Sequence, residues 1–505
     1  MSLHQHISLS AISKTFNYPT LSIPMKISNL FPIACFLMLS NTIFSQTNEE
    51  AARKIDSLFA SYNEKTPGVA VAIVKDGKIV FKKGYGMADL DHDIPITPQT
   101  VFNLASVSKQ FTAFAVYLLE SEGKISLEDD VRKYIPELPV YGKIIKIKHL
   151  LAHISGLRDH GALLSLAGWR LDDVFTNEQI LKLLAAQKKT NVEPGTAFGY
   201  SNTNYILLAE IVRRTSGKTL AEYTSEKIFK PLGMTSTQFC DNAEKIVKNK
   251  AESYEFDKGA YYHKILTSSN VGPSNLLSTV EDLGKWALNF ENPIVGNIKL
   301  IKAFNEASHL DNGQKVVMRI IDGDTIFQAK GQNLWKHKGI STISHGGHTA
   351  AFRTYLGRFP DQHLSIIQLS NDEDNERLGG RWDIADFYIK DKLQERKRTN
   401  PVNATNANIK PIVNYTTSLK EFEGEYFNDE LRTSYTFEMK GEKLMMKHIR
   451  LGDIELKRIG ESKFSGSGEQ TFSFEMEFLR NGTGAVTEFV ISNFGVKNLK
   501  FARQK

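Results

Sequence analysis

The sequence predicts an α/β chain of the α+β kind, with an antiparallel sheet flanked by terminal helices, an inserted helical subdomain, and a small all-β, barrel-like C-terminal domain. Two observations predict this fold. Within residues 46–396, the patterns of a helix and a hairpin come first, helical patterns follow through the middle, and patterns of strands and a helix come last. After a polar segment, alternation of apolar and polar residues dominates residues 418–505.

Residues 1–45 have the character of a signal segment. Lys26 precedes an apolar run from Leu30 to Leu39, about ten residues, which is too short to cross a bilayer and typical of a signal core. We therefore expect export, with the mature protein beginning near Gln46 in the periplasm or outside the cell. No later segment reaches the roughly 18 consecutive apolar residues of a transmembrane helix, so we expect no stable membrane span.

The elements of residues 46–396 follow from local patterns. Thr47 and Glu50 form a capping-box pair that predicts a helix over 48–64. Two β-rich runs around Asp76-Gly77 predict a hairpin. Residues 104–300 look mostly helical.

The sequence pattern changes again toward the end of residues 46–396 and in the segment that follows them. Strand patterns return over residues 339–370, and a helix is expected over 381–396. Residues 397–417 are polar and contain two prolines, which predicts a linker. Residues 418–505 are expected to fold separately. Since the residues that could carry chemistry all lie before residue 349, we expect that the chemistry does not require residues 418–505.

Composition excludes several classes of protein. The chain has 63 basic and 57 acidic residues in 505, a net charge of +6, and 41% hydrophobic residues, which excludes a disordered chain. No run of basic residues with interleaved aromatics is present, so we expect no nucleic-acid partner. Of the two cysteines, Cys35 lies in the signal segment, and Cys240 is expected to be a buried small apolar residue.

Three short motifs could carry chemistry. Ser106 and Lys109 are three apart on a predicted first helical turn, which places a nucleophile beside a base. Tyr200 and Asn202 are two apart in an extended loop and offer a phenol and an amide. Each pair alone is also consistent with an ordinary helix cap or turn.

The third motif is glycine-rich. Ser344-His-Gly-Gly-His348 opens a predicted strand, and its paired glycines allow a substrate backbone to approach closely. A β-bulge beside a surface histidine is the alternative. His149 and His153 have the spacing of metal ligands on a helix, but no third ligand is evident and we favour a structural role. No metal or organic cofactor is expected.

Taken together and in order, these motifs resemble those of the serine β-lactamase and penicillin-binding-protein superfamily, on its class C, D-alanyl-D-alanine carboxypeptidase and esterase branch. That family uses S-x-x-K, then Y-x-N, then K/H-x-G on a strand, here Ser106–Lys109, Tyr200–Asn202 and His345–Gly347. His149-Leu-Leu-Ala-His-Ile-Ser-Gly-Leu157 and Ser278-Thr-Val-Glu-Asp-Leu-Gly-Lys-Trp286 resemble two further stretches of the family. The resemblance covers about residues 48–396, and residues 418–505 resemble a lipocalin-like appendage.

The resemblance implies roles for individual residues. Ser106 would be the acylated nucleophile, with Lys109 as its base or proton partner. Tyr200 would share the proton transfer, and Asn202 would position Lys109 and the substrate. The oxyanion would be held by the backbone N–H groups of Ser106 and His348.

The sequence thus predicts an exported serine hydrolase acting through an acyl-enzyme on an ester or amide, of esterase or D-peptidase type. Its substrate would be a small molecule or a peptide, including one of cell-wall origin. The third motif begins with His345 where lysine is usual, which lowers the expectation of a dedicated β-lactamase. A weak β-lactamase, or a non-catalytic protein that binds cell-wall material or a peptide, remains the alternative.

Overall fold

The computed structural model describes residues 49–170, 172–321, 323–374, 380–394, 415–468 and 471–505. The predicted signal segment and the predicted linker up to residue 414 lie outside the described residues.

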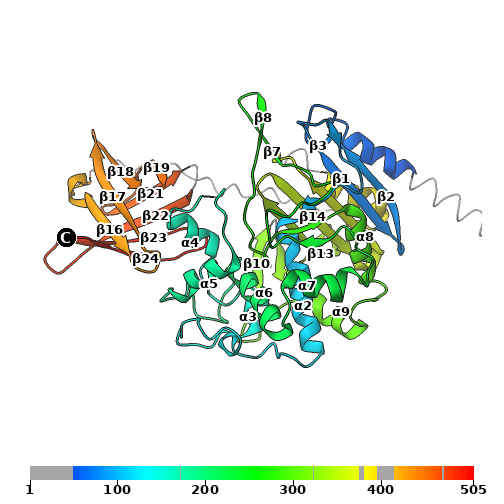
Figure 1. Cartoon of the computed structure of the whole chain (residues 1–505), viewed down its shortest axis with the longest axis horizontal. Helices are drawn as coiled ribbons and strands as arrows, with labels where there is room; N and C mark the ends of the chain where they lie inside the picture. Colours follow the sequence, from blue (N-terminus) through cyan, green and yellow to red (C-terminus); the bar gives the residue numbers. More distant parts are fainter. Residues whose placement is uncertain (1–48, 171, 322, 375–379, 395–414, 469–470) are drawn as a thin grey trace, which may run out of the picture. The chain divides into compact units, whose positions relative to one another are not determined.

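An eight-stranded antiparallel sheet forms the centre of the N-terminal part (Figure 1). In spatial order its strands are β10 (Val317–Ile321), β11 (Asp324–Gln328), β12 (Asn333–His337), β13 (Ile340–Thr349), β14 (Phe352–Phe359), β15 (Leu364–Ser370), β1 (Val69–Lys75) and β2 (Lys78–Tyr85). The predicted hairpin is confirmed, with Asp76 and Gly77 at φ values of 49° and 75°, as a tight turn of type I′ requires.

Both faces of this sheet are covered. Along β1, alternate side chains belong to two separate apolar clusters, with Val69 and Val71 in one and Ala70 and Ala72 in the other. The first cluster includes the terminal helices, and the second includes the helical region between the strands. This arrangement is the predicted sheet with flanking helices and an inserted helical subdomain.

The terminal helices are shorter than predicted. The first spans residues 49–58, after which the chain continues in turns, with the N–H of Tyr62 bonded to the carbonyl of Phe59 at 3.1 Å. A further turn follows at Asn63, whose Oδ1 accepts the N–H of Lys65 at 2.8 Å, and the chain enters the sheet after Pro67. The second, α10 (Arg381–Ile389), continues only as a 3₁₀ turn over Lys390–Lys392. Both lie against the same face of the sheet.

The inserted region is largely helical, as predicted. Its α-helices are α2 (Lys109–Ser121), α3 (Ile147–Leu151), α4 (His160–Leu166), α5 (Asn177–Ala185), α6 (Thr203–Ser216), α7 (Leu220–Thr224), α8 (Val280–Asn289) and α9 (Ile298–Asn305). The sequence did not indicate the hairpin β7 (Tyr254–Asp257) and β8 (Ala260–His263), or the three-stranded sheet β5 (Phe102–Asn103), β9 (Leu276–Ser278) and β6 (Gln238–Phe239). It also missed β10–β12, because β10 is an exposed edge strand without alternation.

The C-terminal part is the predicted all-β structure, an antiparallel sheet of nine strands within the described residues. In spatial order these are β19 (Leu451–Glu455), β18 (Lys443–His448), β17 (Thr433–Lys440), β16 (Gly424–Asn428), β24 (Leu499–Arg503), β23 (Val486–Ser492), β22 (Thr471–Arg480), β21 (Lys463–Gly468) and β20 (Lys457–Arg458). Since β19 and β21 also contact each other, the sheet is nearly closed into a barrel.

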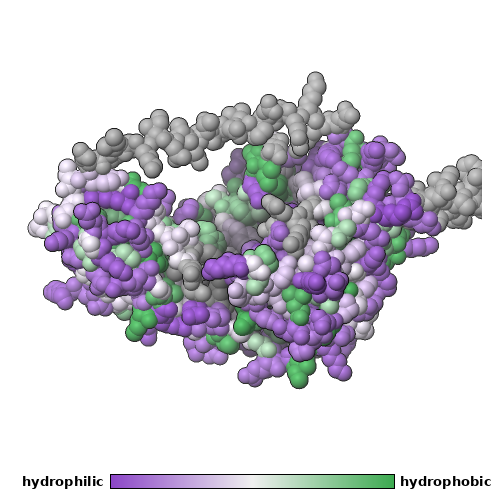
Figure 2. All heavy atoms as spheres, turned by 90° about the horizontal axis from the view of Figure 1, so that it is seen from above, coloured by the Kyte–Doolittle hydropathy of each residue, from purple (hydrophilic) through white to green (hydrophobic). Residues whose placement is uncertain are grey.

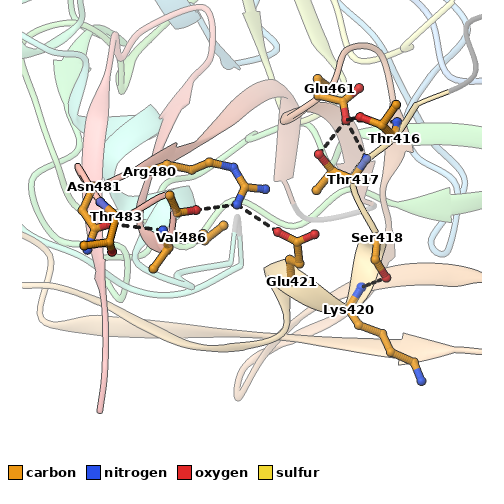
Figure 3. Close-up of polar contacts among 12 residues, drawn as sticks. Thr416, Thr417, Ser418, Lys420, Glu421, Glu461, Arg480, Asn481, Thr483 and Val486 are labelled. Atoms are coloured by element: carbon orange, nitrogen blue, oxygen red, sulfur yellow. Dashed lines mark hydrogen bonds and ion pairs between the residues drawn. The ribbon is translucent and has the colours of Figure 1, made fainter.

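Polar side chains fasten the start of this barrel (Figure 3). One oxygen of Glu461 accepts hydrogen bonds from the backbone N–H and hydroxyl of Thr417, at 2.6 and 2.5 Å, and from the same groups of Thr416. These bonds, the hydroxyl of Thr417 first, lower the pKa of the Glu461 carboxyl to about 2. Nearby, Arg480 pairs with Glu421 at 2.9 Å.

The surface is mainly hydrophilic on the face shown in Figure 2, with apolar residues in small separate groups. Within the described ranges, no helix has both the length and the apolar composition needed to cross a membrane. Cys240 is half-exposed rather than buried, because it follows the two-residue strand β6 into a turn, where its Sγ donates to the carbonyl of Asn242 at 3.3 Å.

Candidate active site

Ser106 and Lys109 lie at a junction between two helical elements. Ser106 is in a 3₁₀ turn over Ala105–Ser108, and Lys109 is the first residue of the buried helix α2. Ala105 opens the turn in the left-handed region, at φ 47°, a conformation that non-glycine residues rarely adopt. The turn directs the two side chains together, and Lys109 Nζ lies 3.0 Å from Ser106 Oγ.

The Lys109 ammonium group is buried and has three oxygen neighbours. Besides Ser106 Oγ, its Nζ contacts Asn202 Oδ1 at 2.8 Å and the carbonyl oxygen of Pro273 at 2.9 Å. Burial lowers the pKa of Lys109 from its ordinary 10.5 to about 7, against a smaller opposing effect of Asp159. A neutral amine has two N–H donors and one lone pair. The two N–H groups can donate to Asn202 Oδ1 and to the carbonyl oxygen of Pro273, which leaves the lone pair facing Ser106.

Tyr200 completes the group of side chains around Ser106. Its hydroxyl lies 2.9 Å from Ser106 Oγ, and its ring stacks on the imidazole of His153 with ring centres 4.5 Å apart. Burial of the hydroxyl raises the pKa of Tyr200, which keeps the phenol protonated near neutral pH. The structure therefore brings together Ser106, Lys109, Tyr200 and Asn202 from segments more than 90 positions apart.

The stretch that holds His149 and His153 supports the loop with Tyr200. His153 Nδ1 accepts the backbone N–H of Ser201 at 3.3 Å, and its carbonyl accepts the N–H of Gly199 at 2.8 Å. His149 Nδ1 accepts the N–H of Lys146 at 3.2 Å, and its Nε2 lies 3.0 Å from an oxygen of Asp311. Both histidines thus have structural contacts, and the described residues hold no cluster of three metal-ligand side chains.

The third motif lies on β13. It occupies the second half of this ten-residue strand and does not open it as predicted, because the strand begins earlier, at Ile340. Gly347 packs tightly on the turn with Ser106, since a Cβ there would lie 2.4 Å from the carbonyl oxygen of Leu104 and 2.9 Å from the Cβ of Ala105. This close approach explains the glycine and places the strand beside Ser106.

The two histidines of this motif differ in exposure. His345 is buried, its Nδ1 lies 2.6 Å from the carbonyl oxygen of Gly346, and burial lowers its pKa to about 4. Near neutral pH it is therefore uncharged. His348, at the exposed end, faces the same cavity, and burial of its ring nitrogens lowers its pKa less.

A cavity of about 930 Å³ opens at Ser106, Tyr200 and Asn202. Most of its wall was not identified from the sequence. The unpredicted lining residues that the arguments below use are Arg319, Trp335, Arg353, Arg381, Trp382 and Phe494. They come from β10, β12, β14, α10 and the loop between β23 and β24, and no local motif marks any of them.

Comparison with known proteins agrees with this geometry. The fold and the grouped side chains define a serine hydrolase of the β-lactamase and penicillin-binding-protein superfamily. The chain belongs to the Beta-lactamase family, whose model matches residues 55–389.

Two curated relatives are similar in sequence. Penicillin-binding protein 4* of Bacillus subtilis is 27% identical over 341 residues, which cover 64% of this chain and 72% of that protein. A D-aminopeptidase of Brucella anthropi is 30% identical over 339 residues, which cover 64% of this chain and 58% of that enzyme. The match with the D-aminopeptidase therefore spans little more than half of its length.

Two solved structures share the fold. The octameric penicillin-binding protein homologue from Pyrococcus abyssi superposes with a TM-score of 0.58 at 22% identity, covering 90% of this chain and 99% of that chain. EstCE1, described as a hydrolase with promiscuous acyltransferase activity, has a TM-score of 0.56 at 20% identity, covering 68% of this chain and 98% of its own.

Proposed function

We propose that this chain is an exported serine hydrolase that cleaves an ester or amide through an acyl-enzyme on Ser106. The observation that carries the proposal is the placement of Lys109 Nζ, 3.0 Å from Ser106 Oγ, with two other acceptors for its remaining hydrogens. A buried amine whose pKa is about 7 has a neutral fraction large enough to act as a base at neutral pH.

Acylation begins with proton transfer from Ser106 to Lys109. Ser106 Oγ attacks the substrate carbonyl carbon as its proton moves to Lys109 Nζ, and the carbonyl π electrons move to the oxygen. The backbone N–H groups of Ser106 and His348 are proposed to stabilise that oxyanion. The tetrahedral intermediate then collapses, and the bond to the leaving group breaks.

Tyr200 is proposed to deliver the proton to the leaving group. Its raised pKa means that the phenol holds a proton near neutral pH, and its hydroxyl lies 2.9 Å from Ser106 Oγ. The phenol donates its proton to the departing oxygen or nitrogen. Lys109, which holds the proton taken from Ser106 and whose Nζ lies 5.0 Å from the centre of the Tyr200 ring, then returns that proton to the phenolate. Water then attacks the acyl carbon as one of its protons moves to Lys109. The bond between the acyl carbon and Ser106 Oγ breaks, Ser106 Oγ takes that proton back, and the acid product leaves.

The cavity favours a substrate with an apolar or aromatic group and a negative charge. Trp335 and Trp382 provide aromatic surface, with ring centres 4.7 Å apart, and three arginines line the same cavity. Arg353 is paired with Glu373 at 2.9 Å, whereas Arg381 lies over the rings of Tyr355 and Trp382. A small ester or a D-peptide with a carboxylate, including one derived from cell wall, fits this chemistry.

A β-lactam is a weaker candidate substrate. The family position that usually carries a lysine cation holds His345, which is uncharged near neutral pH. The non-catalytic alternative is also weaker, because a binding protein has no need of the base, phenol and amide grouped around Ser106.

Intact-mass analysis tests the proposal. The full chain is incubated with a fluorophosphonate, with penicillin, and with p-nitrophenyl esters and D-amino acid amides. We expect one fluorophosphonate adduct on Ser106 and turnover of at least one ester or amide, with little penicillin adduct. No adduct on Ser106, or no turnover on any ester or amide, would reject the proposal.

A further inference from the structure

The carboxylate of Asp159 bridges two elements below the active site. The side chain is buried, at 1% exposure. Its Oδ1 accepts the N–H of Ala162 at 3.1 Å and caps α4, while its Oδ2 accepts the N–H of Asn202 at 2.6 Å. Asn202 in turn accepts from Lys109, so Asp159 is one residue removed from the proposed base.

The segments on either side of this carboxylate are joined by further bonds. Thr203 Oγ1 donates to the carbonyl of Arg158 at 2.7 Å and accepts the N–H of His160 at 2.8 Å. The backbone on the C-terminal side of Ser201 is therefore held by the segment around Asp159, while His153 holds Gly199 and Ser201 on the other side. A shift of Asp159 would therefore move the backbone N–H of Asn202, and with it the side-chain amide that contacts Lys109.

A loop of the C-terminal sheet contacts Asp159 from the other side. In this loop, residues 493–498, the carbonyl of Gly495 accepts the N–H of Asp159 at 2.9 Å and the side chain of Asn191 at 2.9 Å. The contact is tight, since a Cβ on Gly495 would lie 2.6 Å from the Cβ of Asp159 and 2.9 Å from that of Ala162. Only glycine fits against this segment without displacing it.

We propose that Asp159 is a positioning residue that holds Asn202 and, through it, Lys109, and that the 493–498 loop holds Asp159 in place. The proposal rests on the proposed function. It links the C-terminal sheet to the chemistry, although the proposed nucleophile, base and proton donor all lie in the first part of the chain.

Asp159→Asn tests the carboxylate. An amide has one acceptor oxygen, so it can satisfy the N–H of Ala162 or of Asn202, while its NH₂ faces the other. We expect kcat/KM on a small ester to fall by about 10- to 100-fold from misplacement of the base. Because the Asp159 carboxylate raises the pKa of Lys109, the acidic limb of the pH profile should also move to lower pH.

The pH shift separates positioning from a general loss of stability. The other titratable side chains near Lys109 are Tyr200, Tyr205, His153, His160 and His345. The Asp159 carboxylate also raises the pKa of Tyr200 and of His160, so the substitution lowers both. Burial still keeps the Tyr200 phenol protonated and the His160 imidazole uncharged near neutral pH, so the limb reports Lys109. Asp282→Asn is the matched control: this carboxylate is also buried and accepts the N–H of Ser236 at 2.8 Å, but its partners are Ser236, Thr237 and Lys285 and not Asn202. Asp282→Asn should have a lower melting temperature than wild type, but the acidic limb of its pH profile should lie where that of the wild type does.

Three outcomes decide the first half of the proposal. A fall in rate with a shifted limb supports it, whereas either an unchanged limb or an unchanged rate in Asp159→Asn overturns it. If Asp159→Asn does not fold, Asp159→Ser keeps an acceptor for the helix cap and is judged by the same two readouts. A wild-type chain without any Ser106 adduct would instead mean that the proposed function has failed.

Gly495→Ala tests the loop, with Gly482→Ala as its control. Neither glycine has a positive φ, but Gly482 has open space around it. We expect Gly495→Ala to lose about tenfold in kcat/KM, with the acylation rate of Ser106 falling in parallel, while Gly482→Ala matches wild type. Equal rates for the two variants would overturn the role of the loop and leave that of the carboxylate to its own test.

Discussion

Lys109 Nζ lies 2.9 Å from the carbonyl oxygen of Pro273, a residue 164 positions further along the chain. This carbonyl and Asn202 Oδ1 can take the two hydrogens of a neutral amine, which directs the lone pair toward Ser106. In the proposed mechanism, the same contacts would stabilise the protonated amine after it has taken the serine proton. The site is therefore arranged for a lysine that alternates between its two protonation states.

The first prediction concerns pH. Burial lowers the pKa of Lys109 to about 7, and the base must be neutral, so kcat/KM on an uncharged ester should rise with pH and level off above about 7. Initial rates of ester hydrolysis, measured from pH 5 to 9, check this. A profile that is flat across that range would contradict a base role for Lys109.

The second prediction concerns the nucleophile. Ser106→Ala should abolish the fluorophosphonate adduct and lower turnover by about 10³-fold or more. Ser108→Ala is the control in the same turn, since its Oγ accepts the N–H of Leu276 at 3.1 Å and has no contact with the substrate site. This control should lose about 1–3 kcal/mol of unfolding free energy but keep the adduct.

The third prediction treats Lys109 and Tyr200 as one unit. Lys109→Ala and Tyr200→Phe should each cost about 10²- to 10⁴-fold, because proton transfer needs both groups at Ser106. The double variant should then cost little more than the worse single one. Fully additive losses in kcat/KM would show that the two act independently.

How far the sequence predicts this site depends on whether a residue acts through its own side chain and within a local motif. Ser106, Lys109, Tyr200 and Asn202 each belong to a short motif, and the structure brings all four together. The Pro273 carbonyl could not be predicted, because any residue supplies such an acceptor. Trp335 and Trp382 meet only through the pairing of distant elements, which no local pattern encodes.

The fold shows the same division. The hairpin at Asp76-Gly77 follows from turn chemistry alone, so it was predicted correctly. The edge strand β10 was missed, since Ile320 and Ile321 are exposed next to one another and give no alternation. The limits of the terminal helices were also wrong, because the turns after residue 58 and the 3₁₀ turn after Ile389 end them before the apolar spacing does.

The fourth prediction uses two neighbouring glycines of β13. A Cβ on Gly347 would lie 2.2 Å from Thr354 Oγ1 and 2.4 Å from the carbonyl of Leu104, whereas one on Gly346 meets its nearest neighbour at 3.6 Å. Gly347→Ala should therefore displace the turn of Ser106 and cost about 100-fold in kcat/KM. Gly346→Ala should cost much less in the same ester assay. The reverse order would show that the strand does not set the position of Ser106.

The last prediction concerns Phe494, which reaches the cavity wall from the C-terminal sheet although the chemistry was expected not to involve that part of the chain. The residue is 60% exposed at the border of the cavity, so a bulky acyl group can cover part of its apolar surface. Covering about 40 Å² of that ring is worth roughly 1 kcal/mol, or about fivefold in binding. Phe494→Ala should therefore raise KM for a phenylbutyrate ester about fivefold at unchanged kcat, and leave KM for an acetate ester within about twofold of wild type.

The control for Phe494→Ala is Ile449→Ala, which changes a 97% exposed residue of the same sheet outside the cavity. It should change KM for neither ester. Equal losses on both esters would mean that Phe494 acts through its neighbour Gly495 on Asp159 and not by touching the substrate. No change on either ester would show that the loop borders the cavity without contributing to binding.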